Sequence, residues 1–180
     1  MTGGRALPRV VLVGAPGAGK STVGRLVAGR LRVSYRDTDD DVVAVAGKPV
    51  ADIFVDDGEG AFRALERDAV ASALAEWPGV LSVGGGAVLD QQTRKLLRSV
   101  AADGCPIVYL AVSAGEAYKR VGMARGRPLL LGAPRAQLTA LLRARAPLYA
   151  EVATAEVDTD EKEPGKVAEE VLALLAGRQA

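Results

Sequence analysis

The chain of 180 residues contains no histidine and a single cysteine. The lack of histidine excludes Ser-His-Asp and Cys-His catalysis and every metal site that needs imidazole. The lone Cys105 cannot form an internal disulfide and precedes an apolar run, so we expect a buried, packed thiol. Any chemistry must come from carboxylates, arginines, lysines and backbone amides. Any metal is expected to be a hard cation held by oxygen.

Aromatic residues and net charge are also scarce. Two Phe, one Trp and four Tyr leave little material for stacking on nucleic-acid bases. The balance of 23 Lys and Arg against 22 Asp and Glu gives a net charge of +1, which argues against attraction to nucleic acid or anionic membranes. No stretch approaches the ~18 apolar residues of a membrane span, and no signal peptide is recognised. We expect a cytoplasmic monomer with no nucleic-acid or membrane partner.

Glycine, by contrast, is concentrated in one informative run. Residues 14–21 read GAPGAGKS, directly after the apolar Val10–Val13 and before a stretch with helical spacing. Such a loop lets backbone amides approach the phosphates of a nucleoside triphosphate, whereas the alternative is a glycine-rich turn with an incidental lysine. We expect Lys20 to reach the β- and γ-phosphates and the Ser21 hydroxyl to ligate Mg²⁺. The residues predicted to bind the nucleoside triphosphate are Gly17, Ala18, Gly19, Lys20 and Ser21 of this run and the following Thr22.

Strand-like apolar runs alternate with helical patterns, which predicts one α/β domain with a parallel sheet. The predicted strands are Val10–Val13, Val33–Tyr35, Val80–Val83, Ile107–Val112 and Thr154–Val157. The predicted helices are Lys20–Leu31, Asp39–Ala46, Gly60–Glu76, Gln91–Ser99, Ala114–Val121, Arg135–Tyr149 and Pro164–Ala176.

One long segment, Met123–Pro134, fits neither pattern. It contains two glycines and the charged Arg125 and Arg127. In a phosphoryl-transfer enzyme, such a segment is typical of a lid that brings an arginine over the phosphates. The alternative is a surface loop with two solvated arginines.

A run of carboxylates, DTDDD at residues 37–41, follows the second predicted strand. Ligands of parallel sheets bind at the carboxyl ends of strands, so this run is expected beside the phosphate loop. One carboxylate could hold Mg²⁺ through water and another could accept a proton from a substrate hydroxyl. The alternative is an acidic helix start capped by Thr38 or Asp39. We favour a functional role for Asp37 and Asp39, and helix stabilisation for the last two carboxylates.

Three further features are ambiguous by themselves. Gly84-Gly85-Gly86 follows a predicted buried strand and indicates either close approach of a ligand or a flexible turn. Arg63 and Arg145 could clamp a carboxylate between them. Each could equally be solvated, and Arg63 could pair with Glu66 three residues later.

Together these segments resemble the shikimate kinase family from about residue 9 to about residue 164. The motifs occur in the family's order: GAPGAGKST, DTD, ADIF, GEGAFRALE, GGGAV, RPLL, RAPLY and VDT. The resemblance implies a three-layer α/β/α sandwich with a five-stranded parallel sheet, the P-loop NTPase fold of the nucleoside-monophosphate-kinase type. Residues 1–180 would form a single domain, with the substrate-binding region at about 38–66 and the lid at about 122–134. It also implies ATP-dependent phosphorylation of the 3-hydroxyl of shikimate, with Mg²⁺ as cofactor.

The resemblance also implies residue roles. Asp37 would support Mg²⁺ through water, and Asp39 would contact the shikimate hydroxyls and act as catalytic base. Lys20 and the lid residue Arg127 would stabilise the transferring phosphoryl group, and Arg120 would lie on the adenine side. The residues implied to bind shikimate, besides Asp39, are Arg63, Arg145, Gly84, Gly85, Gly86, Phe54 and Phe62.

Alternatives remain at this point. Another small-metabolite kinase such as a gluconokinase would share the phosphate loop, and a non-catalytic ATP-binding paralogue would retain the fold. The segment 158–163 is more acidic than is usual beside the family's adenine site. We therefore assign Lys162 no binding role.

Overall fold

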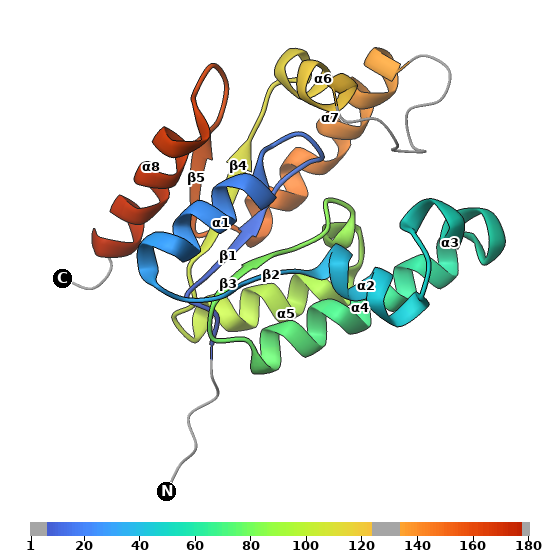
Figure 1. The fold of residues 1–180 in the computed structure, drawn as a ribbon, viewed down its shortest axis with the longest axis horizontal. Helices are drawn as coiled ribbons and strands as arrows, with labels where there is room; N and C mark the ends of the chain where they lie inside the picture. Colours follow the sequence, from blue (N-terminus) through green and yellow to red (C-terminus); the bar gives the residue numbers. More distant parts are fainter. Residues whose placement is uncertain (1–6, 124–133, 178–180) are drawn as a thin grey trace, which may run out of the picture.

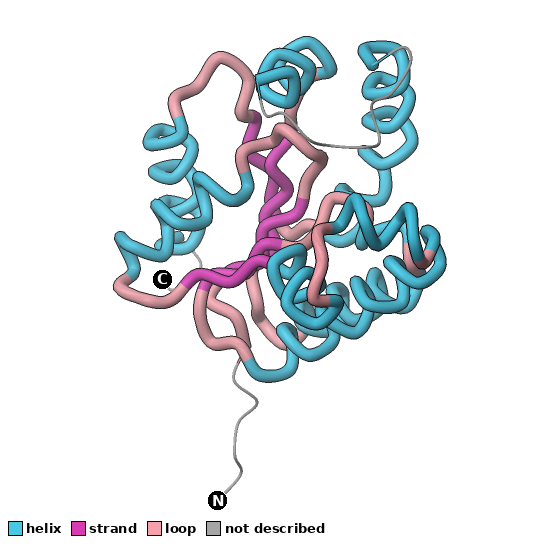
Figure 2. Tube along the Cα trace, turned by 45° about the vertical axis from the view of Figure 1, so that its right-hand side comes forward, coloured by secondary structure: helices cyan, strands magenta, loops and turns pink. Residues whose placement is uncertain are grey.

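The computed structural model describes residues 7–123 and 134–177. Its centre is a five-stranded sheet in the order β2-β3-β1-β4-β5, and every neighbouring pair is parallel (Figures 1 and 2). The strands are β1 Val10–Val13, β2 Tyr35–Asp37, β3 Val80–Ser82, β4 Ile107–Ala111 and β5 Ala155–Asp158. Because β1 is central, the chain leaves it toward β2 and β3 on one side and later toward β4 and β5 on the other. That reversal creates a crevice at the carboxyl end of β1, where ligands of such sheets bind.

Helices cover both faces of the sheet, which confirms the predicted three-layer α/β/α architecture. Within the described residues, α1 and α8 pack on one face, and α4, α5 and α7 pack on the other. The helices are α1 Lys20–Leu31, α2 Thr38–Ala46, α3 Val50–Asp56, α4 Gly58–Glu76, α5 Gln91–Ala102, α6 Ala114–Met123, α7 Pro134–Val152 and α8 Pro164–Gly177, with a 3₁₀ turn η1 at Ala87–Leu89.

The sequence of β1 explains the two cores. Val10 and Leu12 belong to the core under α1 and α8, whereas Val11 and Val13 belong to the core under α4, α5 and α7. All four side chains are at most 1% exposed, so this strand has no solvent face. A continuous apolar run is what a parallel strand covered on both faces requires, and each such side chain contributes about 1.5–3 kcal/mol by burial.

Two local predictions were wrong. The second strand begins at Tyr35 rather than Val33, because α1 ends with Arg32 in the left-handed conformation (φ 56°). The Val33 amide then donates to Ala28 O at 3.0 Å and completes the helix end instead of entering the sheet. Helix α3 was not predicted, because its seven residues are too few to establish a period. It forms a small separate core with α2 and α4 around Val42 and Ile53.

Three segments meet at the carboxyl edge of the sheet. The glycine-rich loop follows β1, the DTD segment follows β2, and the three glycines follow β3.

None of the helices in the described part of the chain combines the length and apolar character of a membrane span. The buried Cys105 confirms the predicted packed thiol.

Candidate active site

The glycine-rich loop forms an open cradle at the start of α1. Gly17 and Gly19 have φ of 83° and 87°, a left-handed conformation that favours glycine. Gly19 is the N-cap of α1 and supplies no side-chain cap, so the amides of the first turn face the cradle. Lys20 Nζ crosses the loop and donates to the carbonyls of Gly14 at 2.8 Å and Ala15 at 3.2 Å. Backbone amides, a helix N-terminus and an ammonium group converge here, as an anion site requires.

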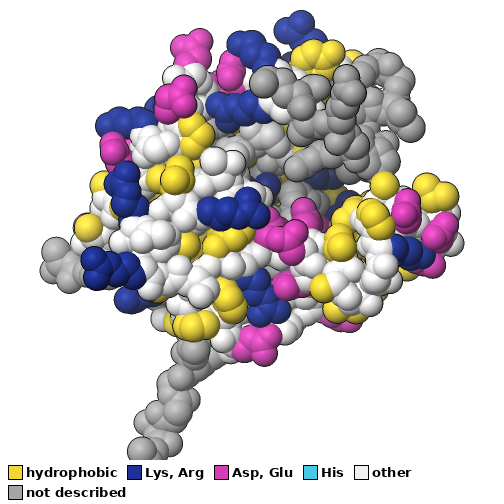
Figure 3. Space-filling view, in the orientation of Figure 1, with side chains coloured by type: hydrophobic (Ala, Val, Ile, Leu, Met, Phe, Trp, Pro, Cys, Tyr) yellow, Lys and Arg dark blue, Asp and Glu magenta, His cyan; other side chains and the backbone are white. Residues whose placement is uncertain are grey.

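A single cavity of about 1040 Å³ runs from this cradle to helices α3, α4 and α7 and to the loop before α8. The space-filling view shows the molecule hollowed between the α3 lobe and the core, with acidic and basic side chains close together (Figure 3). This volume exceeds the usual range for one small ligand and leaves room for two. The predicted site residues that line it are Gly17, Ala18, Gly19, Lys20, Ser21, Thr22, Asp37, Asp39, Phe54, Phe62, Arg63, Gly85, Gly86, Arg120 and Arg145.

Next to the cradle, oxygen atoms gather at the end of β2. Ser21 Oγ and the Tyr35 hydroxyl both donate to Asp37 Oδ2, each at 2.9 Å. Asp37 Oδ1 accepts the Asp39 amide at 3.1 Å, so the cap of α2 is Asp37, whereas the alternative interpretation of this run named Thr38 or Asp39. Burial, with a smaller effect of the Asp37 charge, raises the pKa of Tyr35 to about 12, so the phenol remains a donor.

This oxygen set suits a magnesium ion that also binds phosphate. The described residues contain no group of three or more Cys, Asp or Glu side chains that could hold a metal by themselves. Mg²⁺ commonly takes one or two protein oxygens and completes its shell with water and substrate phosphates. The Ser21 hydroxyl and the Asp37 carboxylate, beside the cradle, fit that arrangement.

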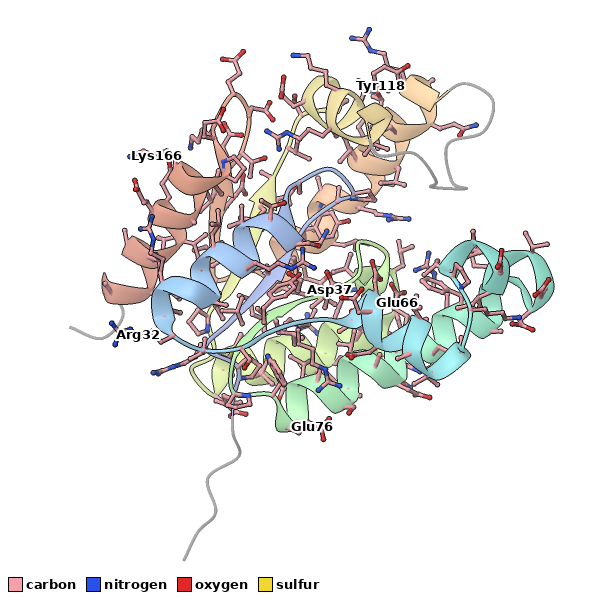
Figure 4. The ribbon with its side chains drawn as sticks, in the orientation of Figure 1. Arg32, Asp37, Glu66, Glu76, Tyr118 and Lys166 are labelled. Carbon is pink, nitrogen blue, oxygen red and sulfur yellow. The ribbon has the colours of Figure 1, made fainter. Side chains whose placement is uncertain are left out.

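The second half of the cavity holds a compact group of charges. Arg63 Nη1 lies 2.6 Å from Glu66 Oε2, and Glu66 is only 3% exposed. Burial raises the pKa of Glu66, whereas the Arg63 charge opposes the rise. Figure 4 labels Glu66 on α4 and Asp37 at the end of β2. A Cβ on Gly84 would lie 2.6 Å from Asp39 Oδ1 and 2.6 Å from Glu66 Oε1, so these carboxylates share one small space.

Gly84 lies against the carboxylates of Asp39 and Glu66 but does not line the cavity, whereas Gly85 and Gly86 do. Its amide donates to the buried Thr38 Oγ1 at 3.0 Å, which joins the glycine segment to α2. The sequence analysis considered Glu66 only as a partner for Arg63. The burial of Glu66 depends on how α4 packs in the folded chain, and no local sequence pattern predicts that packing.

Helix α7 brings Arg145 to the same cavity. Arg145 is 8% exposed, and its Nη1 donates to Gly85 O at 3.2 Å. The Tyr149 hydroxyl donates to the same carbonyl at 2.5 Å, and its ring stacks on Tyr109 with centroids 5.1 Å apart. Burial raises the pKa of Tyr149 to about 12. Arg145 is therefore not a solvated arginine, and Tyr149 is a supporting residue that the sequence analysis missed.

Arg120 joins the cradle to the loop before α8. Its guanidinium donates to Gly17 O at 3.3 Å, to Thr159 Oγ1 at 3.1 Å and to Thr159 O at 2.6 Å. Lys162 also lines this end of the cavity, where it pairs with Glu170 at 2.9 Å.

On the opposite side, the rings of Phe54 and Phe62 pack with centroids 4.7 Å apart. The predicted lid residue Arg127 lies outside the described residues.

Fold and site together define the class of protein. A parallel sheet, a GxxxxGKS loop between β1 and α1, and a carboxylate at the end of β2 that accepts the Ser21 hydroxyl are the features of a P-loop kinase. The sequence profile of the shikimate kinase family matches residues 16–176. The shikimate kinase of Saccharopolyspora erythraea is 54% identical over 174 residues, which cover 96% of this chain and 97% of that protein. The chain belongs to the shikimate kinase family.

Solved structures agree with this assignment. A shikimate kinase from Acinetobacter baumannii in complex with shikimate is similar with a TM-score of 0.89 and 32% identity, covering 97% of this chain and 96% of that one. A gluconokinase from Sinorhizobium meliloti 1021 matches with a TM-score of 0.62 and 24% identity, covering 96% and 94% of the two chains. The second similarity shows only a shared fold, so the gluconokinase alternative lacks the sequence support that the shikimate kinase family has.

Proposed function

We propose that this protein transfers the γ-phosphoryl group of ATP to the 3-hydroxyl of shikimate, forming shikimate 3-phosphate and ADP. The observation that carries the proposal is the shared cavity of the phosphate cradle, Asp39 and the two arginines Arg63 and Arg145. This cavity suits a substrate whose carboxylate binds Arg63 and Arg145 and whose hydroxyls face Asp39 near the phosphates. Membership of the shikimate kinase family supports the same acceptor.

The cradle would hold the phosphates of ATP. Lys20 donates to two loop carbonyls, and phosphate oxygens would attract its ammonium more strongly than neutral carbonyls do. The amides of residues 17–22 would add hydrogen bonds at the positive end of α1. Arg120, fixed by Thr159, would form a wall on the adenine side.

Ser21 and Asp37 would hold Mg²⁺, the serine directly and the carboxylate through water. When bound, the ion neutralises charge on the β- and γ-phosphate oxygens. The Ser21 hydroxyl has its proton committed to Asp37, so its lone pairs remain for a cation.

Asp39 would orient the attacking hydroxyl and accept its proton. Arg63 and Arg145 would bind the carboxylate of shikimate, with Phe54 and Phe62 enclosing the ring. Phosphoryl transfer depends chiefly on alignment and on neutralising charge, so fixed positions matter more here than a strong base. Glu66 holds Arg63 in place, and the Gly85 carbonyl holds Arg145.

The test measures ADP release from Mg·ATP by purified protein with shikimate, gluconate or AMP as acceptor. We expect turnover with shikimate alone. Turnover with another acceptor would contradict the roles of Arg63 and Arg145, and ATP binding without any turnover would favour a non-catalytic paralogue. An Asp39→Asn variant is expected to lose turnover while it retains ATP affinity. Sedimentation of the same sample would test the expected monomer.

A further inference from the structure

The Tyr35 side chain belongs to the magnesium end of the site, although neither the family resemblance nor the DTD motif includes it. Tyr35 lies on β2, two residues before Asp37. Its hydroxyl donates to Asp37 Oδ2 at 2.9 Å, the same oxygen that accepts the Ser21 hydroxyl. A carboxylate can only accept, so the hydrogen in this contact belongs to the phenol.

The hydrogen bonds to Asp37 leave it no freedom to rotate. Oδ1 is fixed by the amide of Asp39, and Oδ2 is fixed by two hydroxyls that approach from α1 and β2. Of these two, Ser21 is the proposed metal ligand, so its own position can change when a cation and phosphates arrive. Tyr35 is the donor on Oδ2 that does not itself take part in the proposed coordination.

The ring of Tyr35 is held in place by α1. Gly24 is buried against it, and a Cβ at that position would lie only 2.4 Å from Tyr35 Cε2. The Arg25 guanidinium covers the ring, with its Cζ 5.2 Å from the ring centroid. Glycine at position 24 therefore provides the space that lets the phenol reach Asp37.

We propose that Tyr35 is a positioning residue for Mg²⁺: its hydroxyl fixes Asp37 in the orientation that holds the water of the Mg·ATP complex. This inference rests on the proposed function. Removal of a partner that orients a direct metal ligand typically lowers metal affinity 10–100-fold. Asp37 would meet the ion through water, so we expect the lower end of this range, about 10-fold, for the Tyr35 hydroxyl. Shikimate binds through other side chains, so its affinity should not depend on Tyr35.

The test replaces Mg²⁺ by Mn²⁺, which electron paramagnetic resonance detects when it is free in solution. Mn²⁺ is titrated into protein saturated with a non-hydrolysable ATP analogue, for the native chain and for Tyr35→Phe. We expect the Kd for Mn²⁺ to rise about 10-fold in Tyr35→Phe. In turnover assays the half-saturating Mg²⁺ concentration should rise, whereas KM for shikimate stays constant.

Tyr118→Phe is the matched control. Tyr118 lies on α6, is 40% exposed and is far from Asp37 in Figure 4, so removal of its hydroxyl should leave Mn²⁺ affinity unchanged. Gly24→Ala provides a second variant that keeps the phenol but forces its ring away, and it should weaken Mn²⁺ as well.

An Mn²⁺ affinity within twofold of the native value in Tyr35→Phe would overturn the proposal. So would an equal loss of Mn²⁺ and shikimate affinity, because that result would mean a general loosening of the site. If Tyr35→Phe does not fold, Gly24→Ala decides by the same criteria. The titration contains no shikimate, so a native protein that binds Mn²⁺ with the analogue but fails to phosphorylate shikimate would contradict the proposed function alone.

Discussion

Replacing Gly84 by alanine tests how tightly the carboxylates of the site are positioned. The added Cβ would lie 2.6 Å from Asp39 Oδ1 and 2.6 Å from Glu66 Oε1, well inside van der Waals contact. Gly84 is outside the left-handed φ region, so alanine adds no backbone strain and the whole effect is steric. One or both carboxylates must therefore move by about half an ångström or more.

Glu66 has little room to move, because it is 3% exposed and bonded to Arg63 at 2.6 Å. The displacement should therefore fall largely on Asp39. Misplacement of a reacting group by about 1 Å can cost about 100-fold in rate, so we expect kcat to fall about 10- to 100-fold. Overpacking should also lower the free energy of unfolding by about 1–3 kcal/mol.

The assay combines ADP release at saturating shikimate, calorimetric titration of ADP and urea unfolding. ADP affinity should be unchanged, because the three atoms nearest the new methyl group belong to Asp39 and Glu66 and not to the cradle. The control is Gly29→Ala in α1, where a Cβ meets nothing within 4 Å and alanine favours the helix by about 1 kcal/mol. A native kcat together with native stability in Gly84→Ala would refute the argument that these carboxylates are sterically fixed.

Three other substitutions test neighbouring contacts. Thr38→Val removes the acceptor of the buried Gly84 amide and should cost about 1–3 kcal/mol in urea unfolding, with a lower kcat because the segment loosens. Arg145→Ala should raise KM for shikimate about 10- to 100-fold, since hydrogen bonds to charged groups contribute about 1.5–3 kcal/mol, and leave KM for ATP nearly constant. Glu66→Gln should flatten the pH dependence of stability. Burial raises the pKa of Glu66 in the folded chain above its ordinary value of 4.5. The contribution of this carboxyl to the free energy of unfolding is therefore fully present below pH 4.5 and is lost as pH rises through the raised pKa.

Each of these predictions has an outcome that contradicts it. Unchanged stability in Thr38→Val would mean that water replaces the threonine hydroxyl. An effect of Arg145→Ala on ATP alone would contradict the carboxylate-binding role. Parallel stability curves for the native chain and Glu66→Gln between pH 4.5 and neutrality would mean that burial does not shift this carboxyl.

Local sequence was sufficient for the phosphate cradle and for the fold class. The run at residues 14–21 places glycines, lysine and serine within eight consecutive residues, so the chain itself fixes their relative positions. The continuous apolar β1 likewise predicts a covered parallel strand, as the structure confirms. The roles of Asp37 and Asp39 remain predictions, although the structure places both carboxylates in the cavity.

The supporting residues could not be found in this way, because their partners are distant in sequence. Tyr149 meets the Gly85 carbonyl across 64 residues, and Thr38 meets the Gly84 amide across 46. Helix α3 was missed for a related reason, since a seven-residue helix depends on packing against α2 and α4 rather than on its own period.

The sequence by itself determined that this chain has a phosphate-binding P-loop, an α/β fold and no histidine chemistry, because these follow from residue types, from local spacing and from the order of strand-like and helical segments. Only the tertiary structure decided which charged side chains act together. It buried Glu66 against Arg63, brought Arg145 from α7 to Gly85, and directed Tyr35 toward Asp37. The physical reason is that burial and charge pairing depend on how helices pack on a sheet, and that packing is a property of the whole chain.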